Sequence, residues 1–314
     1  MTKKIATRDA YGQELVRLGA ENKDVVVLDA DLSKSTKTYD FFKNYPERFF
    51  NMGIAEANMM VTAAGLATVG KIPFASTFAM FATGRAFEQI RNSIAYPRLN
   101  VKIAATHAGI TVGEDGGSHQ SIEDIAIMRS LPGMTVFVPA DAVETAAAIK
   151  AAAEIKGPVY IRLGRSGVPV LHGDDFKFTP GEAVTLREGE DVALIATGIM
   201  VSMALEAADI LADEGIKAMV IDVHTIKPLD IFAIVEAARK CGAVVTAEEH
   251  SIIGGLGSAV AETLSEHQPV PLQRVGMRDT FGESGKPDEL LKHFGLTAEA
   301  LVEAAKKAVA KKSR

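Results

Sequence analysis

The chain has 314 residues, enough for about two ordinary domains, and its formal net charge is −6 at pH 7. Hydrophobic residues make up 47% and charged residues 24%, as in a typical soluble globular protein, and no apolar run is long enough for a membrane span. The negative charge disfavours a general nucleic-acid-binding surface. Cys241 is the only cysteine, so an internal disulfide is excluded and a reducing, cytoplasmic location is expected.

Short apolar runs alternate with helical patterns in the first half of the chain. Strands are expected over 25–30, 101–109, 134–140 and 159–164, and helices over 8–19, 54–68, 84–95 and 142–155. Strand runs that are apolar on both faces and separated by helices predict a parallel sheet covered by helices on both sides. The stretch 173–191 is polar and turn-rich without a sustained period, which predicts a linker.

The same alternation restarts after this stretch. Strands are expected over 192–198, 217–226, 243–249 and 270–277, and helices over 201–213, 230–240, from about 255, and over 298–312. The sequence therefore predicts an α/β protein with two doubly wound domains, residues 1–172 and a smaller one at 192–314.

Glu56 is a carboxylate in an otherwise apolar segment, "NMGIAEANMM". Met59, Met60 and Ala63 share its face of the expected helix, so Glu56 projects toward a core or an interface. A buried carboxyl either takes a partner or stays protonated with a raised pKa. An ordinary first-turn glutamate is the plainer alternative, and the buried setting makes Glu56 a candidate functional group.

The densest polar stretch is "THAGITVGEDGGSHQSIED", residues 106–124, directly after an expected strand. Loops at the carboxyl ends of parallel strands are where open α/β sheets bind ligands. His107, Asp115 and His119 are therefore candidate ligand-binding residues, with a polar surface loop as the alternative. The stretch lacks cysteines and tight ligand spacing, so a zinc site is disfavoured, and no metal ligand is predicted in this chain.

Two further sets are candidates only if the fold brings them together. Phe78, Phe81 and Phe87 fit either plain core packing or a wall that stacks on a flat heterocycle. Four separated polar residues would form an anion clamp, with surface positions as the alternative: Arg8, Ser35, His107 and Arg165.

Two motifs near the end of the chain are given structural interpretations. The "GGLG" stretch at 254–257 lacks the third small residue of a dinucleotide loop, so it predicts a helix start. Glu248, Glu249 and His250 form a charged cluster, which we interpret as strand-end packing at a subunit contact.

Several long motifs, in order, resemble the C-terminal half of transketolases, which are thiamine-diphosphate enzymes that move two-carbon ketol units between sugar phosphates. They are "ATRDAYGQEL", "DADLSKST", "NMGIAEANMM", "PFASTFAMF", "GEDGGSHQSIEDIAIMRSLPGMTVFVPAD", "HTIKPLD" and "SGKPDELL". The resemblance implies a pyrimidine-binding domain followed by a transketolase C-terminal domain, and a role in sugar-phosphate metabolism such as the pentose phosphate pathway.

The resemblance also implies roles for individual residues. Glu56 looks like the glutamate that hydrogen-bonds the cofactor's aminopyrimidine ring and promotes removal of the thiazolium proton. Phe81, with Phe78, looks like the wall that stacks on that ring, and Asp31 resembles an acidic residue near the cofactor. His119 would contact both cofactor and substrate and steer protons, and Asp115 would contact substrate hydroxyls. The sugar-phosphate clamp would comprise Arg8, Ser35, His107 and Arg165.

Two departures from the family pattern matter. The stretch "ATGRAFEQ" after Phe81 lacks a tyrosine found in some relatives and carries one extra residue. The Gly-Asp-Gly pattern that holds the cofactor's diphosphate and its metal is missing. The resemblance therefore implies a split enzyme with an α2β2 assembly, in which a separate N-terminal subunit holds most of the Mg²⁺ (or Ca²⁺) site.

Three alternatives stay open. The β subunit of a 2-oxoacid dehydrogenase decarboxylase shares the two-domain plan and the catalytic glutamate. It acts on a carboxylate and not on a sugar phosphate, so the phosphate clamp would be unexplained. A 1-deoxyxylulose-5-phosphate synthase normally carries all its domains in one chain. A non-catalytic regulatory subunit that retains the fold is the third, and intact Glu56, Asp115 and His119 argue against it.

Overall fold

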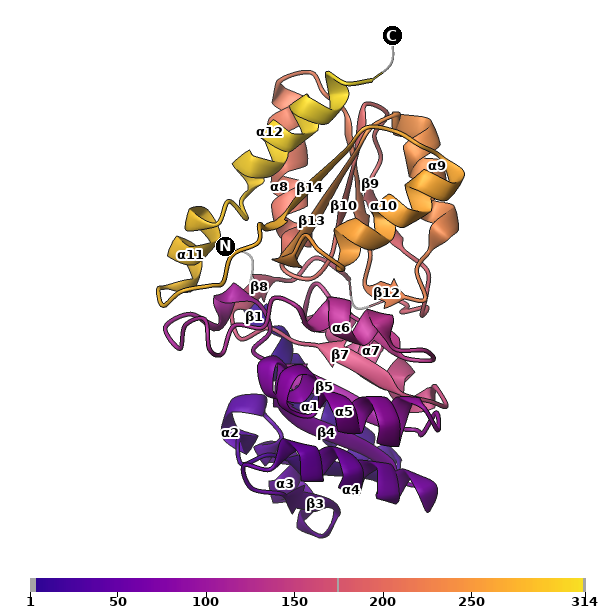
Figure 1. Ribbon diagram of the computed structural model, residues 1–314, viewed down its shortest axis with the longest axis vertical. Helices are drawn as coiled ribbons and strands as arrows, with labels where there is room; N and C mark the ends of the chain where they lie inside the picture. Colours follow the sequence, from indigo (N-terminus) through magenta and orange to yellow (C-terminus); the bar gives the residue numbers. More distant parts are fainter. Residues whose placement is uncertain (1–3, 174, 313–314) are drawn as a thin grey trace.

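The computed structural model describes residues 4–173 and 175–312, and shows two α/β halves stacked along the long axis of the molecule (Figure 1). The first half contains a seven-stranded sheet in the order β12-β6-β7-β5-β4-β2-β3. The second contains a five-stranded sheet in the order β14-β13-β10-β11-β9, and β1 and β8 form a separate pair. The predicted fold class, an α/β protein with two parallel-sheet domains, is confirmed.

The first half supplies most strands of the larger sheet and the helices that cover it. Its strands are β1 (Lys4–Ala6), β2 (Val25–Asp29), β3 (Phe49–Asn51), β4 (Ile72–Phe78), β5 (Lys102–Thr106), β6 (Thr135–Phe137), β7 (Val159–Arg162) and β8 (Gly167–Pro169). Its helices are α1 (Thr7–Glu21), α2 (Ser33–Thr36), α3 (Tyr39–Asn44), α4 (Glu56–Thr68), α5 (Phe87–Gln89), α6 (Asp124–Ser130) and α7 (Ala142–Glu154), with short 3-10 turns η1 (Pro46–Arg48) and η4 (Ile110–Val112).

Strand β4 was not predicted, although it lies in the middle of the larger sheet between β2 and β5. Its run "IPFASTF" contains Ser76 and Thr77, which weaken the apolar signal of a buried strand. Both side chains are fully buried, and the Ser76 hydroxyl is 2.6 Å from the Tyr11 hydroxyl of α1. A hydrogen bond thus compensates the burial of at least one of these hydroxyls.

The helix expected over 84–95 is irregular. Residues Phe81–Arg85 (η2) and Ile90–Ala95 (η3) form π-helical turns on either side of the short helix α5. A π turn accommodates one more residue than an α turn of the same height. The extra residue inferred in "ATGRAFEQ" is therefore absorbed locally, directly after Phe81.

The second half repeats the strand–helix alternation. Its strands are β9 (Val184–Arg187), β10 (Val192–Ala196), β11 (Ala218–Asp222), β12 (Thr225–Lys227), β13 (Val244–Ser251) and β14 (Leu272–Met277). Its helices are α8 (Met200–Asp213), α9 (Ile231–Cys241), α10 (Leu256–His267), α11 (Pro287–His293) and α12 (Ala298–Val309). Among the described residues, no helix is long and apolar enough to cross a membrane.

Two segments of this half differ from expectation. The stretch 173–191, predicted as a linker, contains β9, which pairs antiparallel with β11 as an edge strand of the second sheet. The apolar run 217–226, predicted as one strand, splits into β11 and β12. Strand β12 leaves the second sheet and pairs antiparallel with β6 of the first. The two halves therefore share a sheet rather than only a surface.

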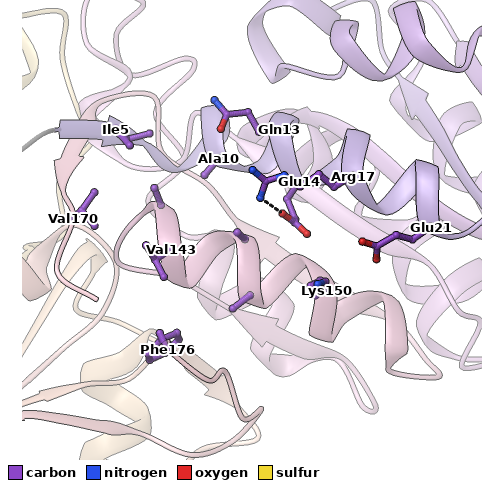
Figure 2. A pocket seen from close by; sticks show the side chains of 13 residues that line it. Ile5, Ala10, Gln13, Glu14, Arg17, Glu21, Val143, Lys150, Val170 and Phe176 are labelled. Atoms are coloured by element: carbon purple, nitrogen blue, oxygen red, sulfur yellow. Dashed lines mark hydrogen bonds and ion pairs between the residues drawn. The ribbon is translucent and has the colours of Figure 1, made fainter. Parts of the chain in front are cut away.

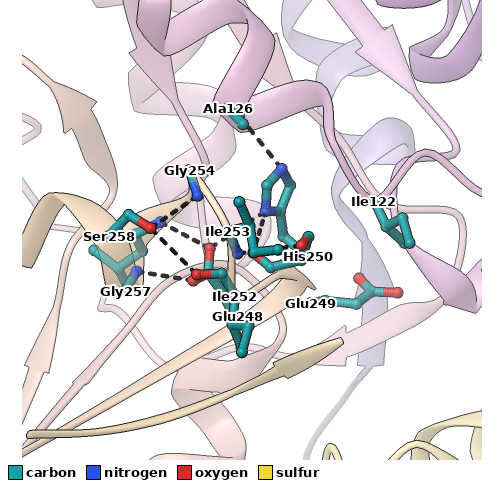
Figure 3. Close-up of polar contacts among 12 residues, drawn as sticks. Ile122, Ala126, Glu248, Glu249, His250, Ile252, Ile253, Gly254, Gly257 and Ser258 are labelled. Atoms are coloured by element: carbon teal, nitrogen blue, oxygen red, sulfur yellow. Dashed lines mark hydrogen bonds and ion pairs between the residues drawn. The ribbon is translucent and has the colours of Figure 1, made fainter. Parts of the chain in front are cut away.

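The cluster at the end of β13 joins the halves within one chain (Figure 3). Glu248 accepts hydrogen bonds from the backbone N–H groups of Leu256 and Gly257, at the start of α10. His250 Nε2 accepts from the Ala126 N–H of α6, 3.3 Å away. The expected helix start at "GGLG" is confirmed, whereas the interpretation of this cluster as a subunit contact is wrong, since these side chains are buried inside this chain.

Candidate active site

Several of the predicted site residues follow the carboxyl ends of four adjacent parallel strands. Asp31 and Ser35 follow β2, Phe81 follows β4, His107 follows β5 and Arg165 follows β7, and these strands lie in the order β7-β5-β4-β2. Because parallel strands end at the same edge of a sheet, the topology gathers residues that are far apart in the sequence.

The anion clamp is held together by Arg8, from the first turn of α1. Its Nη1 donates to the backbone carbonyl of Ser35 at 3.0 Å and lies 2.9 Å from His107 Nε2. Arginine can only donate, so His107 Nε2 is the acceptor and its Nδ1–H donates to the Thr106 hydroxyl, 2.9 Å away. Ser35 contributes its backbone to this contact rather than its hydroxyl.

His107 is a neutral imidazole at physiological pH. Burial, followed by the positive charges of Arg8 and Arg165, lowers the pKa of His107 to about 3. Its φ of 57° is in the left-handed region, which non-glycine residues adopt mainly where the surroundings impose it. His107 therefore positions Arg8 and does not itself contribute positive charge.

Arg165 lies at the other side of the clamp and contacts the polar loop. Its guanidinium donates to the Val112 carbonyl and lies 3.8 Å from carboxylate oxygens of both Glu114 and Asp115. Burial, together with repulsion by Arg165, lowers the pKa of Arg8 despite the opposing effect of Asp9. The charges of the two arginines are thus close enough to repel each other.

Two of the three predicted phenylalanines form a stack with His107 at this edge, and the third does not. The Phe78 ring lies 3.8 Å from the His107 ring and 5.8 Å from the Phe81 ring, nearly parallel to both. His119 meets the Phe81 ring edge-on at 5.3 Å. Phe87, in contrast, packs against the main hydrophobic core, so it belongs to core packing.

Glu56 has a partner that the sequence did not predict. It is the first residue of α4 and is 1% exposed, and Arg85 Nη1 lies 2.9 Å from each of its carboxylate oxygens. The Arg85 guanidinium also lies 4.5 Å from the centroid of the Phe81 ring. A flat, nitrogen-bearing cation therefore lies between a buried carboxylate and an aromatic face. The extra residue inferred in "ATGRAFEQ" is the feature of the sequence that points to this segment.

Asp31 lies at the rim rather than among the stacked rings. Its φ is 65°, and its carboxylate accepts from the Asn51 amide at 3.0 Å. The neighbouring Asp29, which was not predicted, is fully buried and accepts from the Leu32 N–H and from two threonine hydroxyls of the α2 region. Asp29 fixes the loop that carries Asp31 and Ser35.

The polar loop is held by the second half of the chain. Gln120 donates from Nε2 to the carbonyls of Ile110, Gly113 and Glu283, and the Ser284 hydroxyl donates to the Glu114 carbonyl. A Cβ on Gly282 would lie 1.8 Å from Gln120 Oε1, so only glycine allows this approach. The segment 282–284 therefore sets the position of the loop.

The chain also has a groove of about 590 Å³ between α1 and α7 (Figure 2). Ile5, Glu14, Lys150 and Phe176 are among the residues that line it, and none of the predicted site residues does. The candidate site is thus defined by the convergence of polar and aromatic groups, not by this groove.

Comparison with known proteins assigns the chain to a family. The transketolase pyrimidine binding domain family matches residues 3–170, and the transketolase C-terminal domain family matches residues 181–301. The chain belongs to the transketolase family. It carries the pyrimidine-binding and C-terminal domains of that family, as the sequence resemblance implied.

Relatives of similar length are named as parts of transketolases. A Methanocaldococcus jannaschii protein whose name assigns it to a transketolase C-terminal section is 53% identical, over 94% of this chain and 93% of that protein. The 6-deoxy-6-sulfo-D-fructose transketolase subunit SqwH of a Clostridium species is 48% identical, over 98% and 95%. A solved structure described as a split gene transketolase, inactive beta4 tetramer, is 64% identical with a TM-score of 0.93, covering 98% of this chain and all of that chain.

Longer members of the family match this chain over only part of their length. Human transketolase is 40% identical over 98% of this chain, which spans only 50% of the human protein. This transketolase chain therefore corresponds to about half of such a relative, and to nearly the whole of a split-type subunit.

Proposed function

We propose that this chain is the small subunit of a thiamine-diphosphate-dependent transketolase that transfers a two-carbon ketol unit from a ketose phosphate to an aldose phosphate. The observation that carries the proposal is the arrangement of Glu56, Arg85 and Phe81. Glu56 and the Phe81 ring hold the planar, N–H-bearing guanidinium of Arg85 between them. The aminopyrimidine ring of thiamine is also planar and bears N–H groups, so the same carboxylate and aromatic face suit it. The residues present therefore fit the cofactor.

Glu56 would hydrogen-bond the pyrimidine ring, Phe78 and Phe81 would stack on it, and Asp31 and His119 would lie near it. When bound, thiamine diphosphate supplies the carbon nucleophile and electron sink that cleavage of a carbon–carbon bond beside a carbonyl requires. Glu56 is almost completely buried, and among residues 4–173 and 175–312 its carboxylate has no side-chain hydrogen-bond partner other than Arg85. If Arg85 withdraws, the Glu56 carboxyl would be free to hydrogen-bond the pyrimidine ring.

The clamp gives the substrate its orientation. Arg8 and Arg165 would bind the phosphate, and neutral His107 would hold Arg8 in place through its Nε2 lone pair. Arginine matches the tetrahedral oxygens of a phosphate with several N–H groups at once. Ser35 would keep Arg8 directed toward the site, because the Ser35 carbonyl accepts a hydrogen bond from Arg8 Nη1, the nitrogen that also contacts His107.

Asp115 and His119 would act nearer the reacting carbon. Both come from the polar loop, and His119 contacts the Phe81 ring, so it lies beside the proposed cofactor position. An imidazole at this place would orient substrate hydroxyls and move protons near neutral pH. Asp115 would accept a hydrogen bond from a sugar hydroxyl.

A separate subunit would complete the site. The family's diphosphate- and metal-binding pattern is not found in this sequence, and the relatives that match along nearly their whole length are named as sections or subunits. The partner would supply the diphosphate-binding domain and hold Mg²⁺ or Ca²⁺, in an α2β2 assembly. A cytoplasmic sugar-phosphate pathway fits this activity.

The proposal is tested by calorimetric titration of thiamine diphosphate and Mg²⁺ into the purified chain, alone and with the candidate large subunit. Tight binding is expected only in the mixture, and ketol transfer is expected there with sugar phosphates and not with 2-oxoacids. Glu56→Gln should keep the assembly but lower ketol transfer by at least about a hundredfold.

Glu21→Gln, an exposed carboxylate in the same domain, is the matched control and should behave like the unmodified chain. Tight, metal-dependent cofactor binding by this chain alone would refute the shared-site proposal. Decarboxylation of 2-oxoacids without ketol transfer would instead assign the chain to a different reaction.

A further inference from the structure

Three acidic or imidazole side chains meet at the junction of the two halves, away from the site described above. Glu144 comes from the first turn of α7, His172 from the segment after β8, and Asp222 from the end of β11. One ligand atom of each lies within 4.8 Å of the others, and all three side chains are buried. His172 Nε2 is 3.7 Å from an Asp222 oxygen and 4.0 Å from Glu144 Oε1.

The imidazole of His172 is oriented by Asp141, the N-cap of α7. The Asp141 carboxylate accepts from the backbone N–H groups of Glu144, Leu171 and His172, and it lies 3.2 Å from His172 Nδ1. A carboxylate with these partners is an acceptor, so His172 Nδ1 carries the proton that it shares with Asp141. The opposite nitrogen, Nε2, then presents a lone pair toward Glu144 and Asp222. This carboxylate–imidazole relay is the arrangement that supports metal-binding histidines.

Four buried atoms converge on the space between these side chains. Glu144 Oε1, His172 Nε2 and both carboxylate oxygens of Asp222 lack a hydrogen-bond partner within the described part of the chain. Buried polar atoms are normally satisfied, because desolvation without a partner is costly. Burial and the proximity of the other carboxylates raise the pKa of both Glu144 and Asp222, and for Glu144 this outweighs the opposing effect of His172.

We propose that Glu144, His172 and Asp222 form a binding site for a divalent transition-metal ion that links the two halves of the chain. Ligand atoms on one such ion lie about 3 to 4 Å apart, since each bond is about 2.0–2.2 Å long, and small side-chain movements reach this spacing. One imidazole and two carboxylates favour Zn²⁺ or Mn²⁺ over Mg²⁺ and Ca²⁺, which prefer oxygen ligands alone.

The site is structural and is independent of the proposed transketolase activity. It differs from the Mg²⁺ or Ca²⁺ site proposed on the partner, because its ligands are buried in this chain and include a histidine. Glu144 belongs to the first half and Asp222 to the second, so a bound ion would resist their separation. The groups that face it are Asp141, Glu144, His172 and Asp222, with His224 nearby as a further imidazole.

The test uses the untagged full-length chain, stripped with a chelator and dialysed against Zn²⁺, Mn²⁺ or Co²⁺. We expect about one ion per chain by elemental analysis, a visible absorption band with Co²⁺, and a higher melting temperature with metal than without. Asp222→Asn and Glu144→Gln should each weaken binding at least about a hundredfold and abolish the melting shift.

The matched controls are Asp213→Asn and Glu206→Gln, the same chemical changes at exposed positions, which should leave binding unchanged. Circular dichroism checks that each variant is folded. If the unmodified chain binds no stoichiometric metal and shows no melting shift, the carboxyls share protons instead and the proposal is wrong. Binding that survives in both Asp222→Asn and Glu144→Gln would place the ion elsewhere and would equally overturn it.

Discussion

At the scale of single residues, the candidate site is held by contacts among its own side chains. Arg8 is fixed by a histidine nitrogen and a carbonyl, Glu56 is paired with Arg85, and Arg165 contacts the loop carboxylates. Each of these contacts fixes a side chain that would otherwise sample many rotamers. A ligand that replaces such a contact therefore meets groups that are already oriented, which lowers the entropic cost of binding.

The first prediction concerns Arg85 and rests on the proposed function. The guanidinium occupies the place between Glu56 and Phe81 that the pyrimidine ring would take, so the cofactor must displace it. Because Arg85 is half exposed, water screens its side of the ion pair and can solvate the displaced guanidinium. We expect Arg85→Gln to tighten cofactor binding about two- to fivefold in the assembled enzyme, measured by calorimetry.

Arg91→Gln, an exposed arginine on the same helical segment, is the control and should leave the affinity as it is. Weaker cofactor binding in Arg85→Gln would mean that Arg85 belongs to the bound state rather than competing with it.

The second prediction concerns the pH dependence of stability through His107. Its pKa is about 3 in the folded chain and about 6.5 in the unfolded chain, so only the unfolded chain binds this proton between those values. The free energy of unfolding is therefore highest above about pH 6.5 and falls as the pH drops toward 3, by at most about 1.4 kcal/mol per pH unit from this residue.

Replacing His107 by Gln removes this contribution. Urea denaturation between about pH 7 and pH 4 should show a shallower loss of stability in His107→Gln than in the unmodified chain. Parallel pH profiles for the two proteins would show that His107 titrates normally, and the neutral-imidazole assignment would have to be abandoned.

At the scale of elements, the site depends on two local departures from regular structure. The π turn after Phe81 absorbs one residue and carries Arg85 to Glu56. The polar loop after β5 has little regular structure of its own, and Gln120 holds it to the segment 282–284. The C-terminal domain therefore contributes to the site through the loop, without supplying a predicted site residue.

The third prediction tests this support. Gly282→Ala places a Cβ against Gln120, whose amide is already engaged by three carbonyls, so the loop must shift. We expect faster hydrogen exchange over residues 113–120 by about tenfold or more, measured by mass spectrometry on this chain alone.

Gly65→Ala is the control, since nothing lies within 4 Å of a Cβ added there and Ala is the better helix former. Unchanged exchange of the loop in Gly282→Ala would show that the close approach is not required for its position.

At the scale of the whole molecule, the two halves are joined by a strand and by buried charges. Strand β12 completes the first sheet, and Arg162 of β7 bonds to the Asp124 carboxylate and to the backbone carbonyl of Glu249. Glu249 in turn accepts from the Thr111 N–H at 2.7 Å. These contacts make the halves one cooperative unit at their junction.

The fourth prediction is that Arg162→Met destabilises the chain strongly. It leaves the buried Asp124 and Glu249 carboxylates without their cation, which typically costs about 3–5 kcal/mol. Denaturant unfolding measures the loss. Arg187→Met removes a surface pair with Asp209 and should cost less than about 1 kcal/mol. Equal losses in the two variants would contradict the assignment of Arg162 as a buried junction residue.

The sequence by itself determined the alternation of strands and helices, the family and most of the candidate site. Periodic apolar runs and ordered motifs are local signals, and parallel-strand topology alone brings the loops after β2, β4, β5 and β7 together. Ser35, Phe81, His107 and Arg165 were therefore predictable as neighbours at one edge of the sheet, whereas Glu56 and Arg8 follow other strands.

The tertiary structure decided the contacts between distant segments, which do not show up as a periodic pattern in the sequence. Arg85 reaches Glu56 across 29 residues, β12 crosses to the first sheet, and Glu144, His172 and Asp222 meet from three separate segments. Strand β4 was missed because its buried hydroxyls look polar until their surroundings are known. Such features depend on which surfaces pack together, and that follows from the balance of burial, hydrogen bonding and charge over the whole chain rather than from any one stretch of it.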